Sequence, residues 1–206
     1  MPRRGRGLLR RWPALAAGLA VSAACGPVPE TAAGPARADD PVVERLAPLA
    51  GSYACVGDVL PGPGAPPLSF AAVENLWLAE DGRTVRLVYV EADADGAAGA
   101  RGWGTIWYDD EARVVRTSWT DTTMPGRSLQ GRGEFADDGS LVFAAHASGA
   151  DGRTLDLRLT YRFPVPGTYE YELGEMAEDG AYVPLLQLTA IRTGPPATTW
   201  DPPAEL

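Results

Sequence analysis

The chain contains no lysine, one histidine (His146) and two cysteines (Cys25 and Cys55) among its 206 residues. The absence of lysine excludes a P-loop, a Schiff-base lysine and a kinase-type lysine. A single histidine excludes a zinc site built from several histidines, and cysteines so far apart form no CxxC motif. We therefore expect no metal site.

Positive charge is also scarce beyond the first residues. The whole chain has a net charge of -9, and residues 1–38 hold six arginines against one glutamate, which leaves -14 on residues 39–206. Such an acidic surface repels nucleic acid. We expect no nucleic-acid partner.

The sequence opens with the features of a secretory signal. Residues 1–11 carry five arginines, and the apolar run WPALAAGLAVSAAC follows at residues 12–25. A basic start and a short apolar run that ends in small residues are typical of a signal peptide. The run is too short and too rich in alanine for a membrane-spanning helix. We predict a signal peptide at residues 1–25 and an extracytoplasmic location.

Two processing sites remain open. VSAAC at residues 21–25 resembles a bacterial lipobox and predicts a lipid on Cys25, with the Pro- and Ala-rich residues 26–41 as a tether to the membrane. The alternative is ordinary cleavage after Ala38, which obeys the small-x-small rule but lies far from the apolar run. We favour the lipoprotein. Cys55 then has no disulfide partner, and we expect it to be a small buried residue.

Residues 42–193 show repeated strand patterns. In TLDLRLTYRF, one face carries apolar residues and the other polar ones, as in a strand that is buried on one side. The expected inward residues of this run are Leu155, Leu157, Leu159, Tyr161 and Phe163. About ten such runs are expected, near residues 52–57, 68–79, 84–92, 102–108, 112–121, 127–135, 141–148, 153–163, 168–176 and 182–192.

Asp-Gly pairs separate many of these runs, at residues 81–82, 95–96, 138–139, 151–152 and 179–180. This dipeptide favours tight hairpin turns in which both central residues have positive φ. The pattern predicts an all-β fold: a single antiparallel up-and-down β-barrel of about ten strands. A short N-terminal helix at residues 42–50 and a Pro-rich tail at 194–206 flank it. A two-sheet sandwich is the alternative, but its Greek-key crossings need longer connections.

Several stretches resemble a known family. The opening L-x-x-L-x-G-x-Y (Leu46, Leu49, Gly51 and Tyr53) is similar to the first strand of calycin-like proteins. Residues 102–121 and 151–192 resemble parts of the DUF1579 family. The resemblance covers residues 46–192 and implies a lipocalin-type barrel of uncharacterised function, with no catalytic motif to transfer.

Nitrobindins, heme-binding relatives of this barrel, use a histidine as the iron ligand. In LVFAAHAS, His146 lies on the face opposite Leu141 and Phe143. If those two side chains point into the core, His146 points outward. We therefore expect a surface or rim histidine rather than a heme ligand, and no cofactor.

Four tryptophans are the candidate ligand-binding residues: Trp77, Trp103, Trp107 and Trp119. Several tryptophans in one small barrel predict a cavity for an apolar ligand. The alternative, which the sequence favours equally, is that their rings simply fill the barrel.

Acidic residues provide a second group of candidates. Glu74 interrupts an apolar strand face, so we expect either an ion pair with Arg86 or Arg116, which we favour, or a ligand anchor. Asp121 is expected to cap the DTTMPG turn rather than act as an acid or base. The pair Asp109-Asp110 is expected to form a turn rather than a metal site.

The sequence therefore predicts an extracytoplasmic lipocalin-like barrel that binds a small apolar or amphipathic molecule and reaches the membrane through Cys25. One alternative is an envelope interaction or structural domain without a pocket. Another, which we favour least, is a barrel isomerase or cyclase that uses a carboxylate and a tyrosine.

Overall fold

The computed structural model describes residues 41–62, 64–92, 98–123, 128–148 and 154–196. The predicted signal peptide and nearly all of the tether and tail lie outside these residues. Helix α1 (Pro41–Leu46) runs directly into the 3-10 helix η1 (Ala47–Leu49), in place of the single helix expected at 42–50. Neither described helix is long and apolar enough to cross a membrane.

Ten strands follow in the described part of the chain, and all are antiparallel to their neighbours in sequence. Their bounds are β1 Gly51–Val59, β2 Leu68–Leu78, β3 Thr84–Ala92, β4 Ala98–Asp109, β5 Val114–Asp121, β6 Ser128–Phe135, β7 Leu141–Ser148, β8 Thr154–Arg162, β9 Thr168–Met176 and β10 Tyr182–Gly194.

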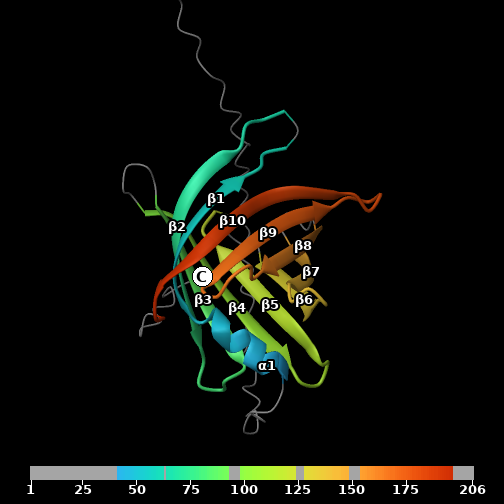
Figure 1. The fold of residues 1–206 in the computed structure, drawn as a ribbon. Coiled ribbons are helices and arrows are strands. Elements are labelled where there is room, and N and C mark those ends of the chain that lie inside the picture. The colour runs from blue at the N-terminus through green and yellow to red at the C-terminus, as the bar shows by residue number, and fades with distance from the viewer. Residues whose placement is uncertain (1–40, 63, 93–97, 124–127, 149–153, 197–206) are drawn as a thin grey trace, which may run out of the picture. The chain divides into compact units, whose positions relative to one another are not determined.

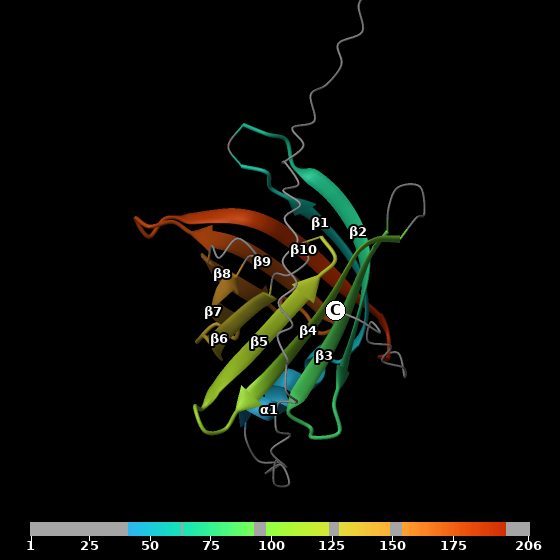
Figure 2. The ribbon, with the colours of Figure 1, turned by 180° about the vertical axis from the view of Figure 1, so that it is seen from behind.

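Strand β10 pairs with β1, so the ring is closed (Figures 1 and 2). This confirms the up-and-down barrel and excludes the sandwich. Closure gives every strand two hydrogen-bonded neighbours and leaves no open sheet edge. All ten strands and the helix lie within residues 41–194, so a chain that begins at residue 39 retains every element of the fold.

The predicted alternation holds along most of β8. Leu157, Leu159 and Tyr161 are buried, whereas Arg158 and Arg162 are exposed. Phe163 was expected to face inward, and this is wrong: the strand ends at Arg162, and the Phe163 side chain is 38% exposed in the connection to β9.

The three described Asp-Gly turns share one geometry that differs from the expected one. Only their glycines have positive φ (67° at Gly82, 85° at Gly139 and 82° at Gly180). Each glycine N–H donates to the carbonyl of the alanine three residues earlier. This is a type I turn followed by a left-handed glycine. The aspartates accept backbone N–H bonds of 2.9 Å from Arg83, Ser140 and Ala181, respectively. The other two Asp-Gly pairs lie outside the described residues.

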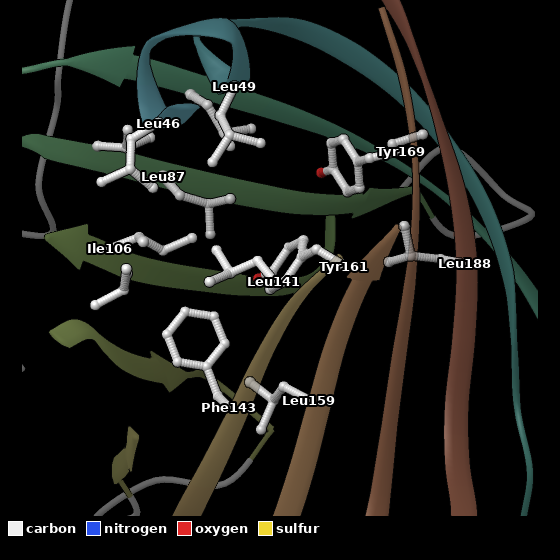
Figure 3. Close-up of a cluster of buried hydrophobic side chains, with 14 of the residues drawn as sticks. Leu46, Leu49, Leu87, Ile106, Leu141, Phe143, Leu159, Tyr161, Tyr169 and Leu188 are labelled. Carbon is white, nitrogen blue, oxygen red and sulfur yellow. The ribbon is translucent and has the colours of Figure 1, made fainter. Parts of the chain in front are cut away.

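The half of the barrel next to α1 is packed with side chains. Leu46 and Leu49 project from the helical segment into the cluster of buried side chains that also contains Leu87, Ile106, Leu141 and Phe143 (Figure 3). Burying one such side chain contributes about 1.5–3 kcal/mol to folding. The helical segment therefore closes this end of the barrel.

A tyrosine and an arginine fix the helical segment to the strands. The Tyr53 hydroxyl on β1 donates to the Leu49 carbonyl at 3.0 Å, and Arg192 on β10 donates to the same hydroxyl at 3.0 Å. A second hydrogen bond runs from Arg192 to the Pro48 carbonyl. The closed end is thus held by hydrogen bonds as well as by apolar packing.

Candidate ligand-binding cavity

The half of the barrel away from α1 is hollow. A cavity of about 440 Å³ lies there, lined by residues of all ten strands. Val59, Glu91 and Asp121, which lie at or near the ends of β1, β3 and β5, are among the lining residues. These strand ends lie opposite the helix, on the side of the β1–β2 connection (Figure 1). The volume falls within the range of small-molecule sites, about 300–1,000 Å³.

Leucines and aromatic rings make up most of the cavity wall. The leucines are Leu87, Leu129, Leu157, Leu159, Leu173, Leu185, Leu186 and Leu188. The rings are those of Phe70, Tyr89, Trp119, Tyr161, Tyr169 and Tyr171. Such a wall favours apolar molecules.

The rings contact one another in two groups. Tyr161 lies at the centre of one, with its centroid 4.8 Å from that of Tyr171 and 5.9 Å from that of Tyr169. Tyr89 lies at the centre of the other group, with its ring centroid 6.1 Å from that of Trp119 and 6.4 Å from that of Phe70. These spacings are typical of stabilising ring pairs, which hold the wall in one arrangement.

The Trp119 side chain has room in the cavity wall because the residues of β4 that face it are glycines. Gly102 and Gly104 face inward, and Gly104 pairs directly with Trp119 across the β4–β5 ladder. A Cβ atom at Gly102 would lie 2.0 Å from the Trp119 ring, and one at Gly104 would lie 2.9 Å from it. The indole N–H of Trp119 donates to the Asp121 carboxylate at 3.0 Å.

Glu74 is the buried acid of the cavity. Its side chain projects inward from β2 and is 5% exposed. The Cys55 thiol on β1 hydrogen bonds with its carboxyl, whereas Oε2 has no hydrogen-bond partner. Burial raises the pKa of Glu74 to about 8, against a smaller opposing effect of the Cys55 hydrogen bond. Glu74 is therefore largely protonated at neutral pH.

The expected ion pair of Glu74 with an arginine is wrong. Arg116 lies on the outer face of β5, where its Nε donates to Asp109 at 2.7 Å. Arg86 is exposed on the outer face of β3, opposite Trp77. Both arginines occupy strand positions that alternate away from the interior, so neither reaches Glu74.

Three of the four candidate tryptophans lie on the outside of the barrel. Trp77, Trp103 and Trp107 occupy outward positions and do not line this cavity, while Trp119 does. Only Trp119 and Glu74 of the candidate set therefore meet in one place. Trp77, Trp103 and Trp107 stay predictions as ligand-binding residues, without support from the cavity.

Sequence reasoning missed the tyrosines of the cavity. Tyr161, Tyr169 and Tyr171 alternate with polar residues along their strands, a pattern that by itself indicates only which face is buried. Burial raises the pKa of Tyr161 and Tyr171, so both hydroxyls stay neutral at physiological pH. Among the described residues, neither hydroxyl has a protein hydrogen-bond partner, so both are available to a ligand.

Of the other acidic candidates, Asp121 has two roles. It caps the turn after β5, since Oδ1 accepts the Thr123 N–H at 2.8 Å, and it also holds the Trp119 indole. Asp109 Oδ1 accepts the Ala112 N–H at 3.0 Å, as a turn residue does. No group of three or more His, Cys, Asp or Glu that could hold a metal occurs among the described residues.

His146 points outward, as expected from its strand face. Leu141 and Phe143 are fully buried, whereas the His146 side chain is 66% exposed. Its Nδ1 lies 2.7 Å from Oδ1 of Asp156 on the neighbouring strand β8. The imidazole therefore does not reach the cavity.

The barrel is similar in fold to a solved mycobacterial protein. The crystal structure of Rv2717c from M. tuberculosis superposes with a TM-score of 0.56 at 18% identity, over 75% of this chain and 98% of that one. The S-type phycobiliprotein lyase CPES from Guillardia theta gives 0.49 at 14% identity, over 73% of this chain and 90% of that one. No family model and no curated protein matches the sequence. At such identities the likeness shows the fold alone.

Proposed function

We propose that this protein binds a small apolar or amphipathic molecule inside the barrel, outside the cytoplasm, and that a lipid on Cys25 holds it at a membrane. The observation that carries the proposal is the hollow half of the barrel. A cavity of about 440 Å³ is lined mainly by leucines and aromatic rings, with the Glu74 carboxyl inside it. A mostly apolar cavity with few polar groups is the usual form of a small-molecule site.

The packing of the other half supports this proposal. Leu46 and Leu49 of the helical segment and core residues such as Phe143 and Leu141 are almost fully buried at the closed end. If tight packing alone were required, large side chains would fill the open end in the same way. Small residues instead face the cavity at Ala100 and Ala147.

Native mass spectrometry of residues 39–206 tests the proposal. We expect a species heavier than the polypeptide, which loses a reproducible mass on denaturation. Because that mass reports a co-purified molecule, it also identifies the chemical class. A bare polypeptide mass after expression in several hosts, together with no binding of neutral apolar dyes such as Nile red, would contradict the proposal.

An acid–base enzyme is a second candidate function, and Glu74 is the observation that favours it. A carboxyl with a pKa raised to about 8 exchanges protons near neutral pH, as a general acid or base must. Deuterium incorporation from D2O into the co-purified molecule tests this. We expect exchange with the wild-type protein and none with Glu74→Gln if Glu74 moves a proton of the ligand.

An interaction domain has one observation in its favour. Val56, Val73 and Ile191 are at least half exposed on the outer faces of β1, β2 and β10. Val73 and Ile191 both neighbour Ala54, so they belong to one apolar surface. Analytical ultracentrifugation tests whether this surface associates, because Val73→Asp should then dissociate any oligomer.

A further inference from the structure

The charged groups of the cavity all have one sign. The described residues that line it include Glu74, Glu91 and Asp121, but no arginine or histidine. The whole chain contains no lysine, and residues 39–206 carry a net charge of -14. A cavity of this kind attracts cations and repels anions, and the field of the domain acts in the same direction.

Glu74 provides a polar group inside the cavity to which a ligand can bind. Its side chain is 5% exposed and lines the cavity, and its Oε2 has no hydrogen-bond partner. An unpartnered buried polar atom costs free energy, which a ligand group of complementary polarity recovers on binding. The complement of a carboxylate is a charged donor.

Aromatic rings surround the same carboxyl. Its charge acts on the pKa of Tyr89, Tyr161 and Tyr171, which come from β3, β8 and β9. The electron-rich faces of aromatic rings attract cations, and this attraction grows where water is excluded. Rings and carboxylate therefore favour the same kind of ligand group.

Resting on the ligand-binding function above, we propose that the cavity selects apolar molecules that carry a protonated amine, and that the ammonium group binds to Glu74. The apolar body of the ligand then lies against the leucines nearer the mouth, such as Leu129 and Leu173. An alkyl carboxylate of the same length is rejected, because its charge would face Glu74 without a balancing cation.

Binding of such an amine releases a proton. Glu74 is largely protonated at neutral pH before a ligand binds. An entering ammonium ion forms its pair with the carboxylate, so the carboxyl proton passes to the solvent. Cys55, Tyr89, Tyr161 and Tyr171 also face Glu74, and burial raises the pKa of each, so they stay neutral. Tyr53 lies directly opposite Glu74 across the β1–β2 ladder, and its hydroxyl donates to the Leu49 carbonyl.

Three probes of one chain length test the proposal: decylamine, decanol and decanoate. Each is titrated by calorimetry at pH 7 into residues 39–206 that have been unfolded and refolded to remove any bound molecule. We expect decylamine to bind about tenfold or more tighter than decanol, since a desolvated charge pair replaces a neutral contact. Decanoate should bind weakest. Titration in buffers of different ionisation enthalpy should show proton release with decylamine and none with decanol.

Glu74→Gln and Glu170→Gln make a matched pair of variants. Both remove one negative charge, but Glu170 is exposed on the outer face of β9. We expect Glu74→Gln to weaken decylamine about tenfold or more, to change decanol less than about threefold, and to abolish proton release. Glu170→Gln should leave all three values unchanged.

The outcomes separate the two proposals. If decanol binds and decylamine binds no tighter, the selection of amines is overturned but the ligand-binding function stands. The same holds if Glu74→Gln and Glu170→Gln lose decylamine affinity equally. Tight binding of decanoate also overturns the selection. If none of the three probes binds, the ligand-binding function itself is contradicted.

Discussion

The Cys55 thiol and the Glu74 carboxyl hydrogen bond inside the barrel, from adjacent strands. Cys55 pairs with Ala72 across the β1–β2 ladder, and Glu74 lies two residues further along β2 on the same inner face. The carboxyl thereby receives one weak donor and no cation from the described protein. Its pKa is raised because burial outweighs that single hydrogen bond.

Glu74→Gln should stabilise the protein in a pH-dependent way. The folded pKa of Glu74, about 8, lies above its ordinary value of 4.5, so the contribution of Glu74 to stability is most favourable below pH 4.5 and is lost as pH rises through 8. Glutamine has no charge to desolvate. We expect no difference between the proteins at pH 4 and a gain of at most about 5 kcal/mol at pH 9, from about 1.4 kcal/mol per pKa unit.

Urea unfolding of both proteins across this pH range measures the difference. Asp81, Asp109 and Asp138, whose pKa values are lowered at the turns, are present in both proteins and cancel. Glu170→Gln is the control and should stay within about 0.5 kcal/mol of the wild type, as surface changes usually do. A constant difference at all pH values would show that Glu74 does not titrate between 4.5 and 8.

Gly104→Val should displace Trp119 from the cavity wall. A Cβ atom at this position lies 2.9 Å from the indole, and valine adds two more carbons. Overpacking of this kind costs about 1–3 kcal/mol. We expect a lower melting temperature and altered binding of Nile red. Gly194→Ala is the control, because open space surrounds a Cβ atom there, and it should behave like the wild type.

Ala147→Trp should fill the cavity without unfolding the barrel. Ala147 lines the open half, whereas Ala144 on the same strand is exposed on the outer face. We expect Ala147→Trp to weaken binding of decanol and Nile red about tenfold or more, because the new ring occupies ligand volume. Ala144→Trp should retain binding. Equal affinities in the two variants would place the ligand outside the barrel.

Cys25→Ala should release the protein from the membrane. If the lipobox interpretation holds, the wild type incorporates radioactive palmitate and sediments with membranes in a bacterial host that processes lipoproteins, whereas Cys25→Ala does neither. Cys55→Ala is the matched control and should behave as the wild type. A soluble wild-type protein that begins at Asp39 would instead establish cleavage after Ala38.

Much of the barrel could be predicted because each strand pattern is local. Alternation in TLDLRLTYRF reports which face is buried, and this holds for Leu157, Leu159 and Tyr161. The interruption of an apolar face at Glu74 correctly predicted a buried acid. The partners of Glu74 could not be predicted from the pattern. Arg86 and Arg116, the arginines expected to pair with it, lie on the outer face of the barrel.

Strand β4 shows where local pattern fails. In GWGTIWYD the tryptophans are the largest apolar side chains, and hydrophobicity alone favours them as the inward residues. The inward residues are instead Gly102, Gly104, Ile106 and Tyr108. Only glycine fits at Gly102 and Gly104 without displacing the ring of Trp119, which comes from the next strand and occupies the space that larger side chains would need.

The sequence by itself determined the strand order, the hairpin connectivity, the short helix and the acidic charge, because each depends on residues close together in the chain or on composition. Only the tertiary structure decided that half of the interior is filled and half is open, and that Glu74, Cys55 and three tyrosines meet there. Those relations depend on barrel closure, which brings inner faces of strands far apart in sequence within contact distance.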